Sequence, residues 1–409
     1  MVFRSKEFEK LQDWYLQLVI DLDISSNLPI DVLKAIREVV GPGQVQLHEP
    51  SFEGNEGRYL QECLDTTYVS SIGKFVDKFE NDLADFTGAK YAVSVVNGTA
   101  ALQIALKLAG VMPRDEVLVP AFTFIATANA VTYCNAVPHF VESDESTFGI
   151  DALKLNEYLS SETSNVGGQC VSKSSGRIIR AMVPMHVFGH PSDLTGLLSV
   201  AKEFNIALIE DSAESLGSYF KGKHTGTFGL LGTLSFNGNK IITTGGGGAI
   251  LTDDFKLAKY AKHLTTTAKL PHPWKFQHDE IGYNYRMPNL NAALGCAQLE
   301  QLPRKLSSKR ELFNKYCDAF ANVKGIKLLT EPRECSSNYW LQTLILDEIN
   351  LDQRDSILDI TNKDGIKTRP AWELISSQPP YVDCPSMDLT VADLILKRVI
   401  NIPSSPGLL

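Results

Sequence analysis

The stretch YAVSVVNGTAALQIALKL, residues 91–108, decides the fold class of this 409-residue chain. Its first six residues, 91–96, are mostly β-branched or small and predict a buried strand, whereas 99–108 has the pattern of a helix. The same alternation continues downstream, with strands predicted at 116–119, 137–141, 178–183 and 206–210 and helices at 125–134 and 194–204. Such alternation indicates an α/β fold, in which helices cover both faces of a mainly parallel sheet.

Segments on either side of this core complete the expected organisation. Helical spacing occurs at 6–22 and 29–40, the latter ended by Gly41-Pro42-Gly43. The polar, Gly/Ser-rich segment 163–175 is predicted to be a loop. Downstream, we expect helices at 255–263 and 289–302 and strands near 340–346. The predicted parts are an N-terminal helical extension at 1–55, a large α/β domain at 56–275 and a small C-terminal α+β domain at 276–409.

The overall composition argues against several classes of protein. With 44% hydrophobic and 21% charged residues, the chain can bury a large core. A net charge of -9 and the lack of a Lys/Arg-rich run argue against a nucleic-acid surface. The chain starts without an apolar signal core, has no run of membrane-spanning length, and carries seven scattered cysteines without a Cys-x-x-Cys pair. We therefore expect a cytoplasmic protein with reduced thiols that binds neither nucleic acid nor membranes.

A single lysine closes the run SFNGNK, residues 235–240, which is followed by four glycines at 245–248. A free lysine amine has a pKa of about 10.4 and is protonated at neutral pH. Burial lowers that pKa and lets the amine form a Schiff base with an aldehyde cofactor. Lys240 is therefore a candidate catalytic residue, although a surface lysine in a hairpin gives the same local pattern.

Two carboxylates follow the strand predicted at 206–210. Asp211 falls at its carboxyl end, where open α/β sheets bind ligands. A carboxylate there can keep a pyridine nitrogen protonated, which makes pyridoxal phosphate (PLP) an electron sink. Glu214 lies three residues on and can reach the phenolic oxygen of the same ring. The alternative for Asp211 is a helix N-cap.

Two further turns have features that suit a phosphate and a planar ring. At 97–101, small residues join a strand to a helix, so the backbone N–H groups of Gly98, Thr99 and Ala100 can approach an anion. Ser235 could add a hydroxyl. Phe124 lies in the turn after the strand at 116–119, where its ring could stack on a cofactor or simply pack in the core.

Other readings of the sequence carry little weight. His186 and His190 have the i,i+4 spacing of zinc ligands on a helix, but Gly and Pro interrupt the segment, so we expect no metal. Ser235 lacks the Gly-x-Ser-x-Gly context of a hydrolase nucleophile.

Five motifs, in this order and spacing, resemble those of nucleotide-sugar aminotransferases of the DegT/DnrJ/StrS type, which are fold-type I PLP enzymes. The resemblance covers residues 52–405, and it implies PLP as cofactor and a fold-type I architecture with a three-layer large domain. It also implies a homodimer with shared active sites. The motifs are NGTAA at 97–101, FTFIATAN at 122–129, EDSAESLG at 210–217, SFNGNK at 235–240 and GYNYRM at 282–287.

The resemblance also implies a role for each matching residue. Lys240 corresponds to the Schiff-base lysine and Asp211 to the carboxylate on the pyridine nitrogen. Glu214 corresponds to the partner of the ring hydroxyl and Phe124 to the stacking aromatic. Asn284 corresponds to a residue that completes the phosphate site of the partner subunit. The remaining phosphate contacts fall on Thr99, Ala100 and Ser235, and substrate contacts are expected at Lys74, Arg286, His272 and Trp274.

Two residues depart from the family pattern, and the Gly-rich run at 245–248, the long N-terminal extension and the segment HEPSFEGNE at 48–56 resemble a subgroup. Gly246 stands where many relatives have Glu, and Glu214 stands where Gln or His is more frequent. The subgroup implies amination of the C4 keto group of a UDP- or GDP-linked 4-keto-6-deoxy-(N-acetylamino)hexose, with L-glutamate as amino donor, on routes to surface glycans or legionaminic-type nonulosonic acids. The alternatives are a C3-keto sugar aminotransferase, a PLP-dependent sugar dehydratase and a non-catalytic PLP-binding regulator. Retention of Lys240 argues against the dehydratase.

Overall fold

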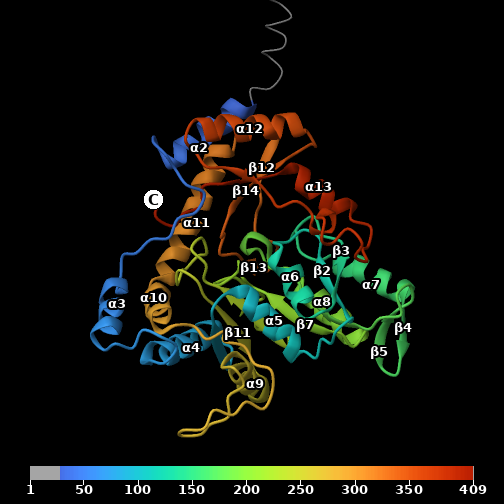
Figure 1. The fold of residues 1–409 in the computed structure, drawn as a ribbon. Coiled ribbons are helices and arrows are strands. Elements are labelled where there is room, and N and C mark those ends of the chain that lie inside the picture. Colours follow the sequence, from blue (N-terminus) through green and yellow to red (C-terminus); the bar gives the residue numbers. More distant parts are fainter. Residues whose placement is uncertain (1–27, 409) are drawn as a thin grey trace, which may run out of the picture.

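A seven-stranded sheet forms the centre of the large domain in the computed structural model, which describes residues 28–408 (Figure 1). The strand order is β1-β11-β10-β7-β6-β2-β3, and only β11 runs antiparallel to its neighbours. The mainly parallel sheet predicted from the sequence is therefore confirmed. Its strands are β1 (Tyr91–Val95), β2 (Glu116–Pro120), β3 (Val137–Val141), β6 (Ile179–Met182), β7 (Ala207–Asp211), β10 (Leu231–Ser235) and β11 (Gly248–Thr252).

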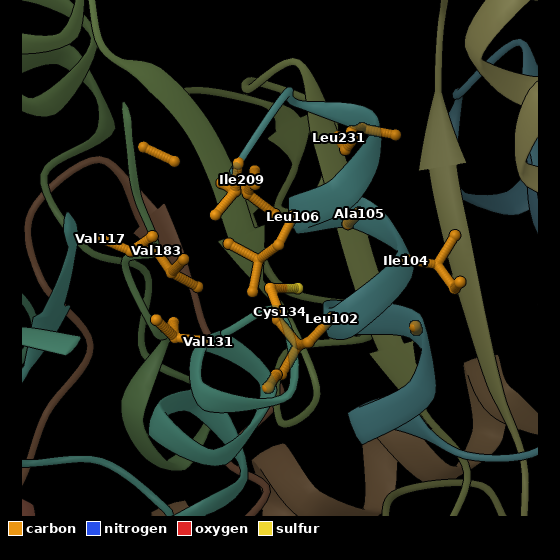
Figure 2. Packing of buried hydrophobic residues seen from close by; sticks show 14 of the residues in the cluster. Leu102, Ile104, Ala105, Leu106, Val117, Val131, Cys134, Val183, Ile209 and Leu231 are labelled. Atoms are coloured by element: carbon orange, nitrogen blue, oxygen red, sulfur yellow. The ribbon is translucent and has the colours of Figure 1, made fainter. Parts of the chain in front are cut away.

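Side chains alternate between the two faces of this sheet, so a layer of helices packs on each face. On one face, Ile209 of β7 packs in a cluster with Leu102 and Leu106 of α5 and Val131 of α6, as Figure 2 shows. On the other face, the neighbouring Leu208 packs with α7 and α8. The first layer contains α5 (Gly98–Leu108), α6 (Ala126–Tyr133) and α9 (Phe255–Thr265), and the second contains α4 (Lys74–Thr87), α7 (Ala152–Glu162), α8 (Leu194–Glu203) and α10 (Asn289–Glu300).

A smaller, four-stranded antiparallel sheet lies above the large one in Figure 1. Helix α11 (Leu302–Phe320) reaches from α10, beside the large sheet, up to the small sheet, where α2 (Leu28–Val40) and α12 (Leu351–Lys363) pack with it. The small sheet has the order β12-β14-β16-β15, with β12 (Ile326–Leu328), β14 (Gln342–Leu346), β16 (Val399–Ile402) and β15 (Arg369–Pro370). Apart from a hairpin at 163–172, the remaining elements are α3 (Glu56–Asp65), α13 (Thr390–Arg398), β8 (Tyr219–Phe220), β9 (Lys223–His224), β13 (Cys335–Ser336) and the 3-10 turns η1 (Val187–Gly189) and η2 (Ile375–Ser377).

Packing links segments across the domain limits predicted from the sequence. Helix α2, in the predicted extension 1–55, packs on α11 and α12, whereas α10, in the predicted domain 276–409, packs on α3 and α4 beside the large sheet. The limits at 55/56 and 275/276 stay a prediction. The contacts favour grouping α2 with the C-terminal domain and α10 with the large domain. The helix predicted at 6–22 lies outside the described residues.

Two local predictions were wrong. The segment 163–175, expected to be a loop, forms a hairpin of β4 (Thr163–Val166) and β5 (Gln169–Ser172), since Gly167 and Gly168 both adopt positive φ at its turn. The helix predicted at 289–302 ends at Glu300, and α11 begins at Leu302. All seven cysteines are free thiols, as predicted. Within residues 28–408, no helix is long and apolar enough to cross a membrane.

Candidate active site

A cavity of about 400 Å³ opens where three strands of like direction end, with the antiparallel strand β11 between β1 and β10. Asn97 follows β1, Asp211 ends β7 and Ser235 ends β10, so the sheet itself brings these three side chains to one edge. Residues from the C-terminal part of the chain, Trp340, Arg369 and Trp372, complete the wall of the cavity. The wall includes Gly98, Thr99, Phe124, Met185, Glu214, Asn239, Lys240, Gly246, Trp340, Arg369 and Trp372.

Lys240 reaches into this cavity from the loop after β10. Its Nζ lies 3.1 Å from Oε1 of Glu214, and it lies over the ring of Trp340, 3.9 Å from the ring centroid. The Trp340 indole N–H donates to the carbonyl of Asn239 at 2.7 Å, which ties the ring to the lysine loop. The amine is thus held between a carboxylate and an aromatic face.

Asp211 lies deeper in the same cavity, where it is 3% exposed. One oxygen accepts a hydrogen bond from the Thr127 hydroxyl at 2.8 Å, and the other accepts one from the Ala213 N–H at 3.2 Å. Desolvation by burial raises the pKa of Asp211, while these two donors and the nearby Lys240 oppose the shift. Both donors favour the ionised form, as a partner for a protonated ring nitrogen requires.

The pKa of Glu214 is also raised, but its surroundings differ from those of Asp211. Burial raises its pKa from 4.5 to about 7, and Lys240 opposes the shift. Its second oxygen accepts a hydrogen bond from the Phe188 N–H at 3.0 Å. Phe188 has the left-handed backbone conformation (φ 54, ψ 16), which is strained for a residue with a bulky side chain and which points this N–H at the carboxylate. A carboxyl group with this pKa can hold or release a proton near neutral pH.

The start of α5 has the geometry of an anion site. The Asn97 side chain accepts a hydrogen bond from the Ala100 N–H at 2.8 Å, so Ala100 is the N-cap donor and not a free one. Gly98 and Thr99 line the cavity in the first turn, next to Ser235. A Cβ on Gly98 would come within 2.9 Å of the Cβ of Ser235, so only glycine allows this close approach.

An aromatic wall faces the carboxylates. Phe124 lines the cavity and is 51% exposed, so it is not a core residue. Trp372 lies against it with a ring-centroid distance of 6.4 Å, and Trp372 in turn packs on Phe188 at 5.2 Å. A planar group in the cavity can stack on such a wall.

These residues fit PLP. A helix N-terminus with a hydroxyl suits its phosphate, a buried carboxylate suits its ring nitrogen, a lysine amine suits its aldehyde and an exposed phenyl ring suits its face. Thus the structure brings the predicted Gly98, Thr99, Phe124, Asp211, Glu214, Ser235 and Lys240 to one cavity.

The other predicted residues lie outside the cavity wall formed by residues 28–408. Asn284 is exposed and its backbone bridges to Thr266. Lys74 is exposed and pairs with Glu62. Arg286 bridges to Val95 through its backbone, and its buried Nε has no hydrogen-bond partner among the described residues. His272 and Trp274 lie on the loop after α9, where the Trp274 side chain is 76% exposed.

Several residues of the site were missed from the sequence. Thr127 lies within a quoted motif, but nothing in its spacing shows that it contacts Asp211. Trp340, Arg369 and Trp372 come from the C-terminal part of the chain, where no short motif marks them. His186 lies in the core, where its Nε2 pairs with Glu210 at 3.2 Å and its Nδ1 accepts a hydrogen bond from the Ser192 N–H at 3.1 Å.

Comparisons with known proteins agree with this geometry. Residues 50–409 match the model of the DegT/DnrJ/EryC1/StrS aminotransferase family. A GDP-perosamine synthase from Caulobacter vibrioides is 36% identical over 368 residues, which cover 89% of this chain and 94% of that protein. The solved aminotransferase TlmJ from Streptoalloteichus hindustanus is similar, with a TM-score of 0.80, 25% identity and coverage of 88% and 94%. The PLP form of the putative sugar aminotransferase Spr1654 from Streptococcus pneumoniae has the same fold, with a TM-score of 0.79, 22% identity and coverage of 88% and 94%.

Proposed function

Because the chain belongs to the DegT/DnrJ/EryC1/StrS aminotransferase family, whose members depend on PLP, we propose a specific reaction for this aminotransferase. It transfers the amino group of L-glutamate to the C4 keto group of a nucleotide-linked 4-keto-6-deoxy-(N-acetylamino)hexose. The product serves surface-glycan or legionaminic-type nonulosonic sugar biosynthesis in the cytoplasm. The name GDP-perosamine synthase supports a nucleotide-linked sugar and places a GDP-linked substrate first among those to test.

The observation that carries this proposal is the position of Lys240 between Glu214 and Trp340, in the same cavity as Asp211. When bound, PLP supplies an aldehyde that accepts an amine and a ring that withdraws electrons. Asp211 is placed to keep the ring nitrogen protonated. Gly98, Thr99 and Ser235 would hold the phosphate end of PLP.

Lys240 is the group that moves protons in both halves of the reaction. With its amine free, the Nζ of Lys240 would take the proton from the donor's α-carbon. In the second half it delivers a proton to the sugar carbon that receives the nitrogen. Glu214, 3.1 Å away, can share a proton with this amine. The Trp340 ring limits where the freed amine can swing, because its face attracts the charged form.

We also propose a homodimer in which each subunit completes the other's site. Asn284 is exposed and lies outside the cavity of its own chain, so it is available to the phosphate site of a second copy. Nearby, Trp274, Phe276 and Ile281 are 76%, 78% and 85% exposed, which favours a partner over this surface.

The test is an amination assay with GDP- and UDP-linked 4-keto-6-deoxy sugars, with and without an N-acetyl group, and with a 3-keto sugar as a comparison. L-Glutamate is the donor, and Lys240→Ala protein is the control. We expect an amino sugar with nitrogen at C4, identified by mass and NMR. Amination only of the 3-keto sugar, or of none of the substrates, would contradict the proposal.

A further inference from the structure

A second cavity, of about 380 Å³, adjoins the first and shares Asn239 and Arg369 with it. Since Asn239 precedes Lys240 in the chain, the wall that the two cavities share includes the residue next to the reactive lysine. The other wall residues come from two segments, Gln46, Leu47, His48 and Glu49 on one side and Lys367 and Thr368 on the other.

Backbone pairing fixes both segments of this wall. The Lys367 N–H donates to the carbonyl of Val45 at 2.8 Å. The Ser404 N–H donates to the carbonyl of Leu47 at 2.7 Å, and the Glu49 N–H donates to the Ser405 hydroxyl at 2.8 Å. The cavity is therefore built into the small sheet and is not a gap between loose loops.

The wall presents two cations that have no partner. Within residues 28–408, neither the Lys367 nor the Arg369 side chain makes an ion pair or a hydrogen bond. Other arginines of this region are paired, for instance Arg310 with Glu331 and Arg398 with Glu145. Glu49 supplies the single carboxylate of the wall, so the wall keeps a net positive charge.

A buried histidine, His48, belongs to the same wall. Both ring nitrogens of His48 are buried and lack any hydrogen-bond partner in the described part of the chain. The ring lies 6.5 Å from that of Trp340, which covers Lys240. Buried polar atoms are nearly always satisfied, so an unsatisfied one beside a cationic cavity indicates a polar occupant that is not part of this chain.

We infer that Lys367, Arg369 and His48 form the subsite for the diphosphate of the nucleotide-linked substrate. The inference rests on the proposed function. In a hexose, C4 and C1 lie on opposite sides of the ring, so a sugar with C4 at Lys240 carries its diphosphate into an adjoining space. Arg369 lines both cavities and is placed where the two meet. A guanidinium binds two phosphate oxygens at once, and the lysine adds a second charge.

The test measures binding of GDP, UDP and inorganic pyrophosphate to the PLP-loaded protein by calorimetry. Arg369→Gln and Lys367→Gln are each expected to weaken binding by about tenfold, as loss of one charged hydrogen bond predicts. Lys363→Gln is the matched control, because it removes an equal charge nearby from a lysine that pairs with Asp359 on α12. It is expected to bind like the wild type.

A kinetic measurement distinguishes binding of the nucleotide sugar from binding of glutamate, since both substrates are anions. Arg369→Gln should raise KM for the nucleotide sugar and leave KM for glutamate unchanged. Wild-type diphosphate binding by both variants, or a rise in KM for glutamate alone, would overturn the subsite. If no nucleotide sugar is aminated but the variants still lose diphosphate binding, the proposed reaction fails and the subsite stands.

Discussion

Replacing Glu214 by glutamine tests the electrostatic balance of the active site. The carboxyl group lies 3.1 Å from the amine of Lys240 and accepts a hydrogen bond from the Phe188 N–H. Glutamine keeps the shape and one acceptor oxygen but cannot ionise. The substitution therefore removes the pH dependence of this group and little of its packing.

The magnitude follows from the pKa. Burial raises the pKa of Glu214 from 4.5 to about 7. Because the folded value lies above the unfolded one, the favourable contribution is complete below pH 4.5 and is lost as the pH rises through 7. At about 1.4 kcal/mol for each pKa unit, the full loss is about 3 kcal/mol, of which about 2 to 3 kcal/mol falls between about pH 5 and pH 8.

The assay is urea unfolding of the cofactor-free protein at several pH values, with wild type and Glu214→Gln compared at each. We expect the wild type to lose about 2 to 3 kcal/mol relative to the variant between about pH 5 and pH 8. Glu145→Gln is the control, since that side chain is 71% exposed. A difference between wild type and Glu214→Gln that stays constant with pH would refute the raised pKa.

The remaining predictions concern the cofactor. Lys240→Ala should abolish the visible absorbance of the purified protein that comes from the covalently bound cofactor, and unchanged absorbance would reject the assignment. Asp211→Asn should lower turnover by about two orders of magnitude or more with an unchanged circular dichroism spectrum, because the ring nitrogen loses its charged partner. Wild-type rates would remove that role. Mixing Lys240→Ala subunits with Asn284→Ala subunits should restore part of the activity, and no rescue under conditions that allow exchange would argue against a shared site.

The residues of the site that could be predicted from the sequence are those that directly follow strands of the large sheet. Asp211 lies in register with Thr233 on the parallel strand β10, two residues before Ser235. Parallel strands end at the same edge of a sheet, so motifs that follow these strands must meet. Gly98 belongs to the same set, because β1 runs in the same direction as β10, with the antiparallel strand β11 between them.

The parts that could not be predicted depend on long-range packing. Trp340 reaches Lys240 only because the small sheet packs against the loop after β10, and Arg369 arrives with β15 of that sheet. No periodicity or short motif encodes such a contact. The hairpin of β4 and β5 is a different case, since Gly167-Gly168 is a recognised turn signal that the polar composition of the segment obscured.

Asp211 and Glu214 show how two carboxyl groups in one cavity take different roles. Burial raises the pKa of both, and the charge of Asp211 further raises that of Glu214, because two carboxylates in a low-dielectric site repel. Asp211 receives two hydrogen bonds, from Thr127 and Ala213, that favour its charge. Glu214 accepts one hydrogen bond from the backbone, and its other oxygen pairs with Lys240. The protonation of that lysine must itself change during the reaction. Glu214, with a pKa of about 7, is therefore the carboxyl group placed to exchange a proton near neutral pH, while the two hydrogen bonds to Asp211 favour the ionised form that the ring nitrogen needs.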